Sequence, residues 1–356
     1  MLIAFLVCPS GLGHFSRVMS LVDYLNSAEI GLEIHIWCED WQRKSYLKNN
    51  YNPKNIIFHY GCMQPGVEWS LDPEIYDDGR ITSWETRIAN ESILLSADIV
   101  ISDNLVGALN IRQDTVLMGS FLWSDIFEKA YPSNNTVQEF IYRERFLLEK
   151  YNPDMLCLAD LAMPGVLNRT NALPLPWMCT ESNINEIPKS KKPRISVQIG
   201  LTEAMKNWAA FIIPLLTSIS DYEMYLPEYL MKYVPAENSD NVQTFNFTQH
   251  DDYASCNVII CRPGVGTLTA CIGSDTPMIL VYEEENAEMG HNAECIQKLG
   301  LGFDMGFEWD ETEIIQTVKK LLKPHIYRRT KSRIQSAKKD GLKIASDWIL
   351  DKVYNQ

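Results

Sequence analysis

Residues 258–302 read VIICRPGVGTLTACIGSDTPMILVYEEENAEMGHNAECIQKLGLG, and the start of this stretch decides the fold. Its first four residues are apolar, which is typical of a strand buried on both faces of a parallel sheet. The turn that follows carries Arg262, Gly264, Gly266 and Thr267, and a short helix is predicted to begin there. Glycines let backbone N–H groups approach a ligand, and a helix start attracts anions. This strand–turn–helix unit is therefore suited to a diphosphate.

The rest of the stretch repeats the alternation of strand and helix. A second apolar strand is predicted over Met278–Tyr282, followed by an acidic loop over residues 283–288. Asn292 lies where the next helix opens, and that helix closes at Gly300. Most of the loop glutamates are explained by solvation of an exposed connection.

The same rhythm extends towards the amino terminus. Leu2–Val7 is an apolar run that ends in a glycine-rich turn, and Phe15–Leu25 has helical spacing of apolar residues. Further strands are predicted at Leu32–Trp37, Ile56–Tyr60, Ala97–Ser102, Thr115–Gly119 and Arg194–Ile199. Strands that alternate with helices imply βαβ units, so the predicted fold class is α/β with doubly wound sheets.

A proline-rich stretch divides the chain. We expect an amino-terminal domain over residues 1–170, a linker over 171–193, a second domain over 194–330 and a terminal helix over 331–356. Ligands of such sheets bind outside the carboxyl ends of the strands. The loops at those ends in both domains are therefore expected to face one cleft.

The glycine-rich turn after the first strand carries a second motif. Gly11 and Gly13 allow a tight turn at a helix start, and His14 follows them at the carboxyl edge of the strand. His14 is either a ligand-facing group or a histidine that caps or packs the helix. Arg17, one turn further on, is either a phosphate ligand or a surface charge.

Composition narrows the function classes. The chain has 356 residues and a net charge of −14, which argues against a general nucleic-acid-binding role. Nine scattered cysteines without metal-ligand spacing favour reduced thiols in a cytoplasmic protein. No apolar run is long enough to cross a membrane. The segment from Lys319 to Lys352 holds 11 Lys and Arg against 3 Asp and Glu, which indicates a solvated helix face or peripheral contact with an anionic membrane.

Residues 258–302 resemble the donor-binding half of GT-B glycosyltransferases. They are similar to the nucleotide-sugar-dependent family-1 enzymes and to the bacterial N-acetylglucosaminyltransferase of peptidoglycan synthesis. The order is shared: apolar strand, Gly-x-Gly-Thr turn, short helix, proline, strand, acidic loop, Asn-Ala helix and Gly-x-Gly. The turn that ends at His14 resembles the amino-terminal motif of the same families. The resemblance implies two Rossmann-like domains facing a cleft, with a C-terminal helix that crosses back to the first.

The resemblance also implies an inverting, metal-independent transfer of a sugar from a nucleotide-diphosphate sugar to an acceptor hydroxyl. His14 is then the general base and Asp103, after the strand Ala97–Ser102, supports it. No metal and no cofactor are expected beyond the nucleotide sugar as co-substrate. The expected acceptor is a sugar, a lipid-linked molecule or a small molecule. The residues expected to bind the donor and its phosphates are Gly11, Gly13, Gly200, Thr202, Arg262, Gly264, Gly266, Thr267, Glu288 and Asn292.

Two positions depart from the pattern of these families. Ala270 stands where relatives carry a glutamate that binds the ribose hydroxyls, which suggests a deoxyribose donor such as a dTDP-sugar, or a remodelled site. Met289 follows Glu288 where relatives often carry glutamine to contact the sugar. Two explanations fit four aromatic residues equally well, the lining of an acceptor groove and the packing of the core. These residues are Trp69, Trp84, Trp123 and Tyr131.

Two other functions fit part of this pattern. Nucleotide-sugar hydrolases of sialic-acid-like pathways share the fold and a Gly-x-Gly-His-x-x-Arg start, which His14 and Arg17 match. Water then takes the place of the acceptor hydroxyl. A non-catalytic GT-B-like subunit is the other alternative, and Ala270 and Met289 favour it.

Overall fold

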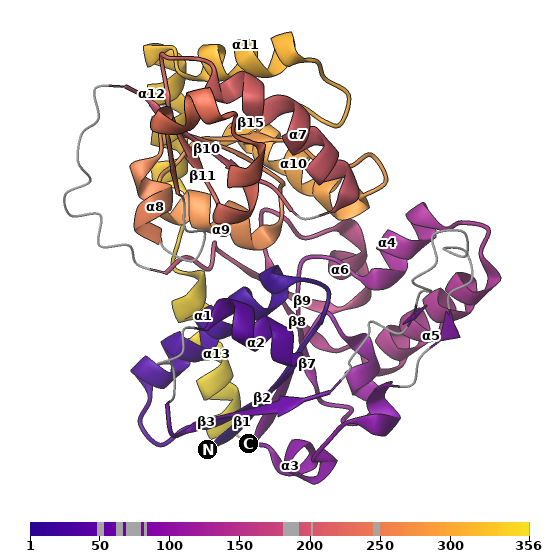
Figure 1. Cartoon of the computed structure of the whole chain (residues 1–356). Helices are drawn as coiled ribbons and strands as arrows, with labels where there is room; N and C mark the ends of the chain where they lie inside the picture. The colour runs from indigo at the N-terminus through magenta and orange to yellow at the C-terminus, as the bar shows by residue number, and fades with distance from the viewer. Residues whose placement is uncertain are drawn as a thin grey trace. The chain divides into compact units, whose positions relative to one another are not determined.

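The computed structural model describes residues 1–47, 53–61, 67–68, 80–81, 84–180, 192–200, 202–244 and 250–355. The chain forms two compact units (Figure 1). Unit 1 comprises residues 1–178 and 340–356, and unit 2 comprises residues 179–339. Each unit has its own parallel sheet and its own core. The predicted α/β class with two doubly wound sheets is confirmed.

Unit 1 is built on a seven-stranded parallel sheet. In sheet order its strands are β3 Ile56–Tyr60, β2 Glu33–Cys38, β1 Leu2–Val7, β6 Ile99–Asp103, β7 Val116–Met118, β8 Asp154–Leu158 and β9 Asn171–Leu175. The helices are α1 Leu12–Ala28, α2 Asp40–Tyr46, α3 Glu91–Ser96, α4 Trp123–Ala130, α5 Asn135–Tyr151, α6 Pro164–Arg169 and α13 Gly341–Tyr354, with 3-10 turns η2 Trp84–Arg87 and η3 Val106–Asn110. A short antiparallel pair joins β4 Val67–Glu68 to β5 Arg80–Ile81. The strand order reverses between β1 and β6, which is where doubly wound sheets bind ligands.

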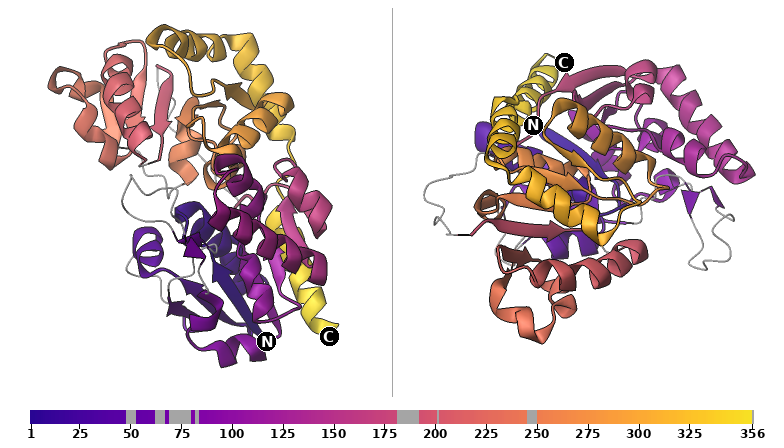
Figure 2. Two further views of the ribbon diagram at one scale, coloured as in Figure 1. Left: turned by 90° about the vertical axis from the view of Figure 1, so that its right-hand side faces the viewer. Right: turned by 90° about the horizontal axis from the view of Figure 1, so that it is seen from above.

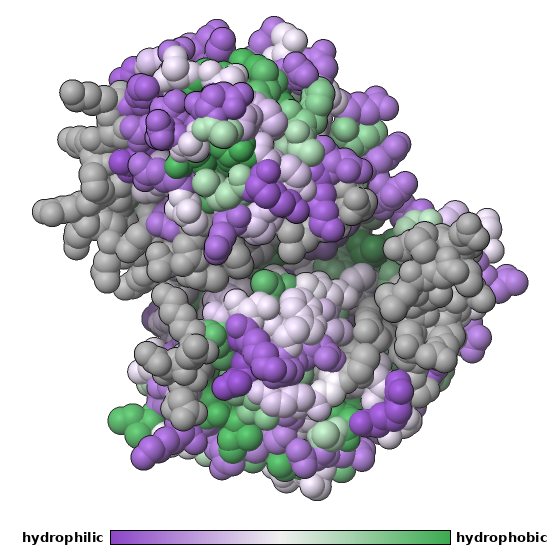
Figure 3. Space-filling model, in the orientation of Figure 1, coloured by the Kyte–Doolittle hydropathy of each residue, from purple (hydrophilic) through white to green (hydrophobic). Residues whose placement is uncertain are grey.

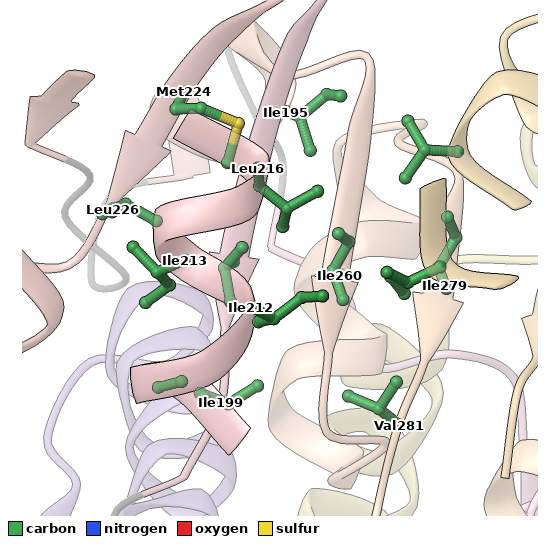
Figure 4. Packing of buried hydrophobic residues seen from close by; sticks show 14 of the residues in the cluster. Ile195, Ile199, Ile212, Ile213, Leu216, Met224, Leu226, Ile260, Ile279 and Val281 are labelled. Atoms are coloured by element: carbon green, nitrogen blue, oxygen red, sulfur yellow. The ribbon is translucent and has the colours of Figure 1, made fainter. Parts of the chain in front are cut away.

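Unit 2 is built on a six-stranded parallel sheet. In sheet order its strands are β12 Val242–Thr244, β11 Glu223–Leu226, β10 Arg194–Gln198, β13 Val258–Cys261, β14 Met278–Leu280 and β15 Gly302–Asp304. The helices are α7 Glu203–Thr217, α8 His250–Ser255, α9 Val265–Gly273, α10 Ala287–Leu299, α11 Glu311–Leu321 and α12 Pro324–Ser336, with 3-10 turns η4 Glu228–Tyr233 and η5 Ala236–Asn241. Ile212 and Leu216 of α7 pack with strand residues such as Ile260 (Figure 4). This fully buried aliphatic layer fixes the strand ends that carry the loops of the unit.

The expected linker over residues 171–193 is corrected at its start. Residues 171–175 form β9, the edge strand of the first sheet, and Pro174 lies within it. Proline removes a backbone donor, but an edge strand has one side without a partner strand and tolerates it. Residues 181–191 of the expected linker lie outside the described part of the chain.

The expected terminal helix over residues 331–356 is two helices. The chain is extended at Ala337, after α12 has ended, and Asp340 forms a bridge with Met178 at the start of α13. Helix α13 then packs against α1 and β9 of unit 1, so that both chain ends lie close together (Figures 1 and 2). The basic tail, residues 319–352, is therefore divided between the units, because α12 belongs to unit 2 and α13 to unit 1.

The face of the molecule drawn in Figure 3 carries both polar and apolar residues. In the view of Figure 3, strongly apolar residues form small separate areas among polar ones. Two lysines of the basic tail are paired with carboxylates, Lys339 with Asp275 and Lys352 with Asp154. Among the described residues, every helix is too short or too polar to span a bilayer.

A buried carboxyl group gives unit 1 a pH-dependent stability. The side chain of Glu144 on α5 is buried and accepts a 2.7 Å hydrogen bond from the Ser124 backbone N–H at the start of α4. Burial raises the pKa of the Glu144 carboxyl to about 7, against the hydrogen bonds from Ser124 and the charge of Arg145, which lower it. The ordinary value is 4.5, so the folded protein retains this proton to higher pH than the unfolded chain. Stability is therefore lost as the pH rises from about 4.5 to about 7.

We predict that Glu144→Gln removes this loss, because the amide oxygen still accepts the Ser124 hydrogen bond and carries no charge. The free energy of unfolding of the variant, relative to wild type, rises by about 2 kcal/mol between about pH 5 and about pH 8. Urea unfolding at both pH values measures it, and Glu149→Gln on the exposed face of α5 is the matched control. A difference between Glu144→Gln and wild type that does not change with pH contradicts the assignment.

Candidate functional site

The turn between β1 and α1 has a shape that depends on glycine. Gly11 caps α1 with φ +107°, a conformation that L side chains rarely adopt, and its N–H donates to the Pro9 carbonyl at 2.8 Å. The fully buried Gln42 of α2 donates its side-chain amide to the carbonyls of Cys8 at 3.0 Å and Gly11 at 2.9 Å. Gln42 therefore holds the turn in place. Nothing in the sequence distinguishes this glutamine from a surface residue of an amphipathic helix.

The turn places His14 beside Asp103. Asp103 is the last residue of β6 and lies opposite Val7 of β1, so the neighbouring strands end side by side. His14 Nδ1 lies 3.3 Å from each carboxylate oxygen of Asp103. The Asp103 side chain is fully buried, and that of His14 is 12% exposed. The structure thus brings together the two residues that the sequence analysis selected, 89 positions apart in the chain.

Arg17 completes this group. Its Nη2 donates to Asp103 Oδ1 and lies 3.4 Å from His14 Nδ1, and its side chain is 8% exposed. Arg17 was expected to be a phosphate ligand or a surface charge, and it is instead a buried partner of the carboxylate. Burial by itself raises the pKa of Asp103, but the charges of Arg17 and His14 and their hydrogen bonds outweigh burial and hold that pKa below its usual value. Asp103 is therefore an anion at neutral pH.

The aromatic residues near this group mainly build the core. Phe121 lies edge-on to the His14 ring, with centroids 6.2 Å apart, and packs against Trp123. Trp84 is 2% exposed in a hydrophobic cluster, so it does not line a groove. Tyr131 packs with Trp123 on a second cluster around α4. Trp69 lies outside the described residues.

In unit 2, the glycine-rich turn forms the start of α9. Gly264 is the N-cap residue, and the helix begins at Val265. The N–H groups of a first helical turn have no acceptor within the helix, so those of Val265, Gly266 and Thr267 are suited to an anion. Gly264, Gly266 and Thr267 are all partly exposed.

Asn292 of α10 holds the loop that precedes α9. Its Nδ2 donates to the Pro263 carbonyl at 2.9 Å, and the residue is 1% exposed. Asn292 was expected to bind the donor, and the structure shows it bracing the loop before α9. Met289 is also buried, and its Cε would lie 3.9 Å from a Cβ placed on Gly264. Met289 therefore fills space under the turn.

The loops that follow β10, β13 and β14 of unit 2 meet at Glu283. Its Oε2 accepts from Arg262 Nε at 2.8 Å, and its Oε1 accepts from Thr202 Oγ1 at 2.5 Å. Gly200 lies beside this group, since a Cβ there would be 3.5 Å from Arg262 Nη1. The prediction that Glu283 is a solvated loop residue is wrong. Its carboxylate accepts hydrogen bonds from two of the expected donor-binding side chains.

Two further positions lie nearby in the chain. Glu288 is in the first turn of α10 with a half-buried side chain. Ala270 lies on α9 and is partly exposed. Within the described ranges, no group of three or more His, Cys, Asp or Glu side chains is placed to hold a metal ion.

Comparison with known proteins finds similarity to glycosyltransferases. Residues 225–345 match the glycosyltransferase family 28 C-terminal domain. An uncharacterized glycosyltransferase of Methanosarcina acetivorans is 22% identical, with 94% of this chain and 91% of that protein covered.

Solved structures share the fold over the whole chain. A UDP-glucosyltransferase from Polygonum tinctorium, capable of glucosylating indoxyl, superposes with a TM-score of 0.68 at 12% identity, covering 100% of this chain and 98% of that one. The glycosyltransferase VinC, solved in complex with dTDP, gives a TM-score of 0.62 at 14% identity, with both chains covered completely. Residues 225–345 thus match a glycosyltransferase family 28 C-terminal domain, and the two parallel Rossmann-like sheets give the whole chain the fold of GT-B glycosyltransferases.

Proposed function

We propose that the chain catalyses an inverting, metal-independent transfer of a sugar from a nucleotide-diphosphate sugar to an acceptor hydroxyl. The contact between His14 Nδ1 and the Asp103 carboxylate is the observation that carries this proposal. A carboxylate at Nδ1 selects the tautomer that has its proton on that nitrogen. Nε2 then has a free lone pair and can accept the proton of a hydroxyl.

The reaction follows from this tautomer. The acceptor oxygen gives its proton to His14 Nε2 and forms a bond to the anomeric carbon of the donor. The bond between that carbon and the diphosphate oxygen breaks, and its electron pair leaves with the nucleoside diphosphate. A single displacement inverts the anomeric configuration. Asp103 stabilises the imidazolium that forms.

The departing diphosphate is assigned to the start of α9. First-turn N–H groups and the positive end of the helix dipole stabilise an anion without a metal ion. Thr267 adds a hydroxyl, and Arg262 adds a cation at the end of β13. The structures with dTDP and from a UDP-glucosyltransferase support a nucleoside diphosphate as the ligand class.

Ala270 bears on the choice of nucleotide. A methyl side chain on α9 offers no acceptor for ribose hydroxyls. We therefore propose a deoxyribose donor of the dTDP type, which has one hydroxyl fewer to satisfy.

We predict that dTDP raises the thermal midpoint of the protein more than UDP, GDP, ADP or CMP, with and without EDTA. A ligand at 100 times its dissociation constant stabilises the protein by about 2.7 kcal/mol. Thr267→Ala should reduce the shift, whereas Thr269→Ala, on the same helix, is the matched control. A shift that EDTA abolishes contradicts metal independence, and a larger shift with UDP contradicts the deoxyribose proposal. The absence of any shift contradicts the donor site.

We predict that His14→Gln lowers turnover by about 10²–10⁴-fold, the usual contribution of a general base, and leaves the nucleotide-induced shift unchanged. Asp103→Asn should lower turnover as well, because it no longer fixes the tautomer. Turnover is followed as nucleoside diphosphate release with and without acceptors. Undiminished turnover in His14→Gln sinks the assignment, and sugar release that no acceptor increases favours hydrolysis instead.

The contacts of Glu283 predict that its charge affects nucleoside diphosphate binding. Its carboxylate holds Arg262 and Thr202 and repels an incoming diphosphate of the same sign. Glu283→Gln should therefore tighten nucleoside diphosphate binding several-fold in a calorimetric titration. Glu284→Gln changes the neighbouring exposed residue and should have little effect. Weaker binding in Glu283→Gln would show that the carboxylate positions Arg262 for the ligand.

A further inference from the structure

Arg17 and His14 compete for one buried carboxylate. Both lie in the first two turns of α1, and both face Asp103 at the end of β6. Arg17 Nη2 donates to Asp103 Oδ1 and lies 3.4 Å from His14 Nδ1. The side chains of Asp103, Arg17 and His14 are 0%, 8% and 12% exposed. Water therefore screens the charges of this group poorly.

The charges around the His14 ring oppose each other. An anion beside an imidazole favours the imidazolium, which has no lone pair and is useless as a base. A guanidinium is always charged, so a proton on His14 places a second cation 3.4 Å from Arg17 Nη2. Arg17 thus counteracts Asp103, while the carboxylate still orients Nδ1.

Two uncharged side chains of the described residues also lie near this group, those of Phe121 and Cys8. Phe121 lies against the ring from the loop after β7. Cys8 directly follows β1, and burial raises the pKa of its thiol to about 12. Among the described residues, Asp103 on β6 and Arg17 on α1 are the charged groups whose contacts with His14 Nδ1 the structure shows, at 3.3 Å and 3.4 Å.

A buried ion pair is weak evidence for a role in fold stability. Replacing a buried ion pair by apolar groups of similar volume is often neutral or stabilising. Arg17 Nε is also buried without a hydrogen-bond partner in the described part of the chain, which adds to the cost of the cation.

We propose that Arg17 is a positioning residue that keeps the His14 imidazole unprotonated at neutral pH, and so sets the pH range in which His14 accepts a proton. This inference rests on the proposed role of His14 as the base. It predicts that removal of the Arg17 charge raises the pH at which half of the His14 rings are protonated.

The test is an NMR titration of the full chain with isotope-labelled histidine, and the His14 signal is assigned by its loss in His14→Gln. Arg17→Met, which keeps an aliphatic stem without charge, should move the His14 midpoint upwards by at least about one pH unit, a tenfold change. Arg17→Lys keeps the charge and should stay close to wild type. Asp103→Asn removes the anion and should move the midpoint downwards. A midpoint in Arg17→Met that is unchanged or lower overturns the proposal.

Folding and function are controlled separately. The signals of the buried His35 and His59 report whether unit 1 is folded in each variant. If Arg17→Met does not fold, Arg17→Gln takes its place with the same expected shift. The titration needs neither donor nor acceptor, so a chain without transferase activity still gives a result. In an active chain, Arg17→Met should lose turnover near neutral pH and regain it at higher pH, which a purely structural loss does not do.

Discussion

The candidate site of unit 1 depends on one buried carboxylate that Arg17 and His14 share. Asp103 is buried at the end of β6 and bonds to Arg17, which is always charged, and to His14, which is charged only when protonated. Parallel pairing of β1 and β6 in register, with Val7 opposite Asp103, brings these side chains together. The glycine turn at Gly11 then starts α1 at the place where its first turn reaches the carboxylate. In the proposed arrangement the anion orients the imidazole through Nδ1, and the Arg17 cation lies on the same nitrogen.

Unit 2 follows a different principle, in which the backbone carries the positive charge. The start of α9 offers backbone N–H groups that suit an anion, and buried residues pack against it. Asn292 holds the preceding carbonyl, and Met289 fills the space beneath Gly264. Arg262 next to this turn is paired with Glu283. We propose that unit 1 handles the proton and that unit 2 handles the diphosphate.

The parts of this account that the sequence predicts are those with strong local patterns. Continuous apolar runs predict the strands, and glycines after them predict the turns that hold His14 and Gly264. Asp103 was predicted from the resemblance, which implies a supporting aspartate after a middle strand, and Asp103 directly follows the predicted strand Ala97–Ser102. The contacts of Gln42, Glu283 and Arg17 could not be predicted, because they depend on which strands become neighbours. The predicted linker wrongly includes Pro174 for a similar reason. The place of Pro174 on an edge strand follows from the order of the strands in the sheet.

The central claim is that His14 drives a single displacement without a metal ion. Time-resolved proton NMR of donor turnover in EDTA tests it most directly, because the anomeric signal of the first-formed product reports the stereochemistry of the step. The account predicts a product with the anomeric configuration opposite to that of the donor, formed at an undiminished rate in EDTA and lost in His14→Gln. A product with the configuration of the donor would contradict it.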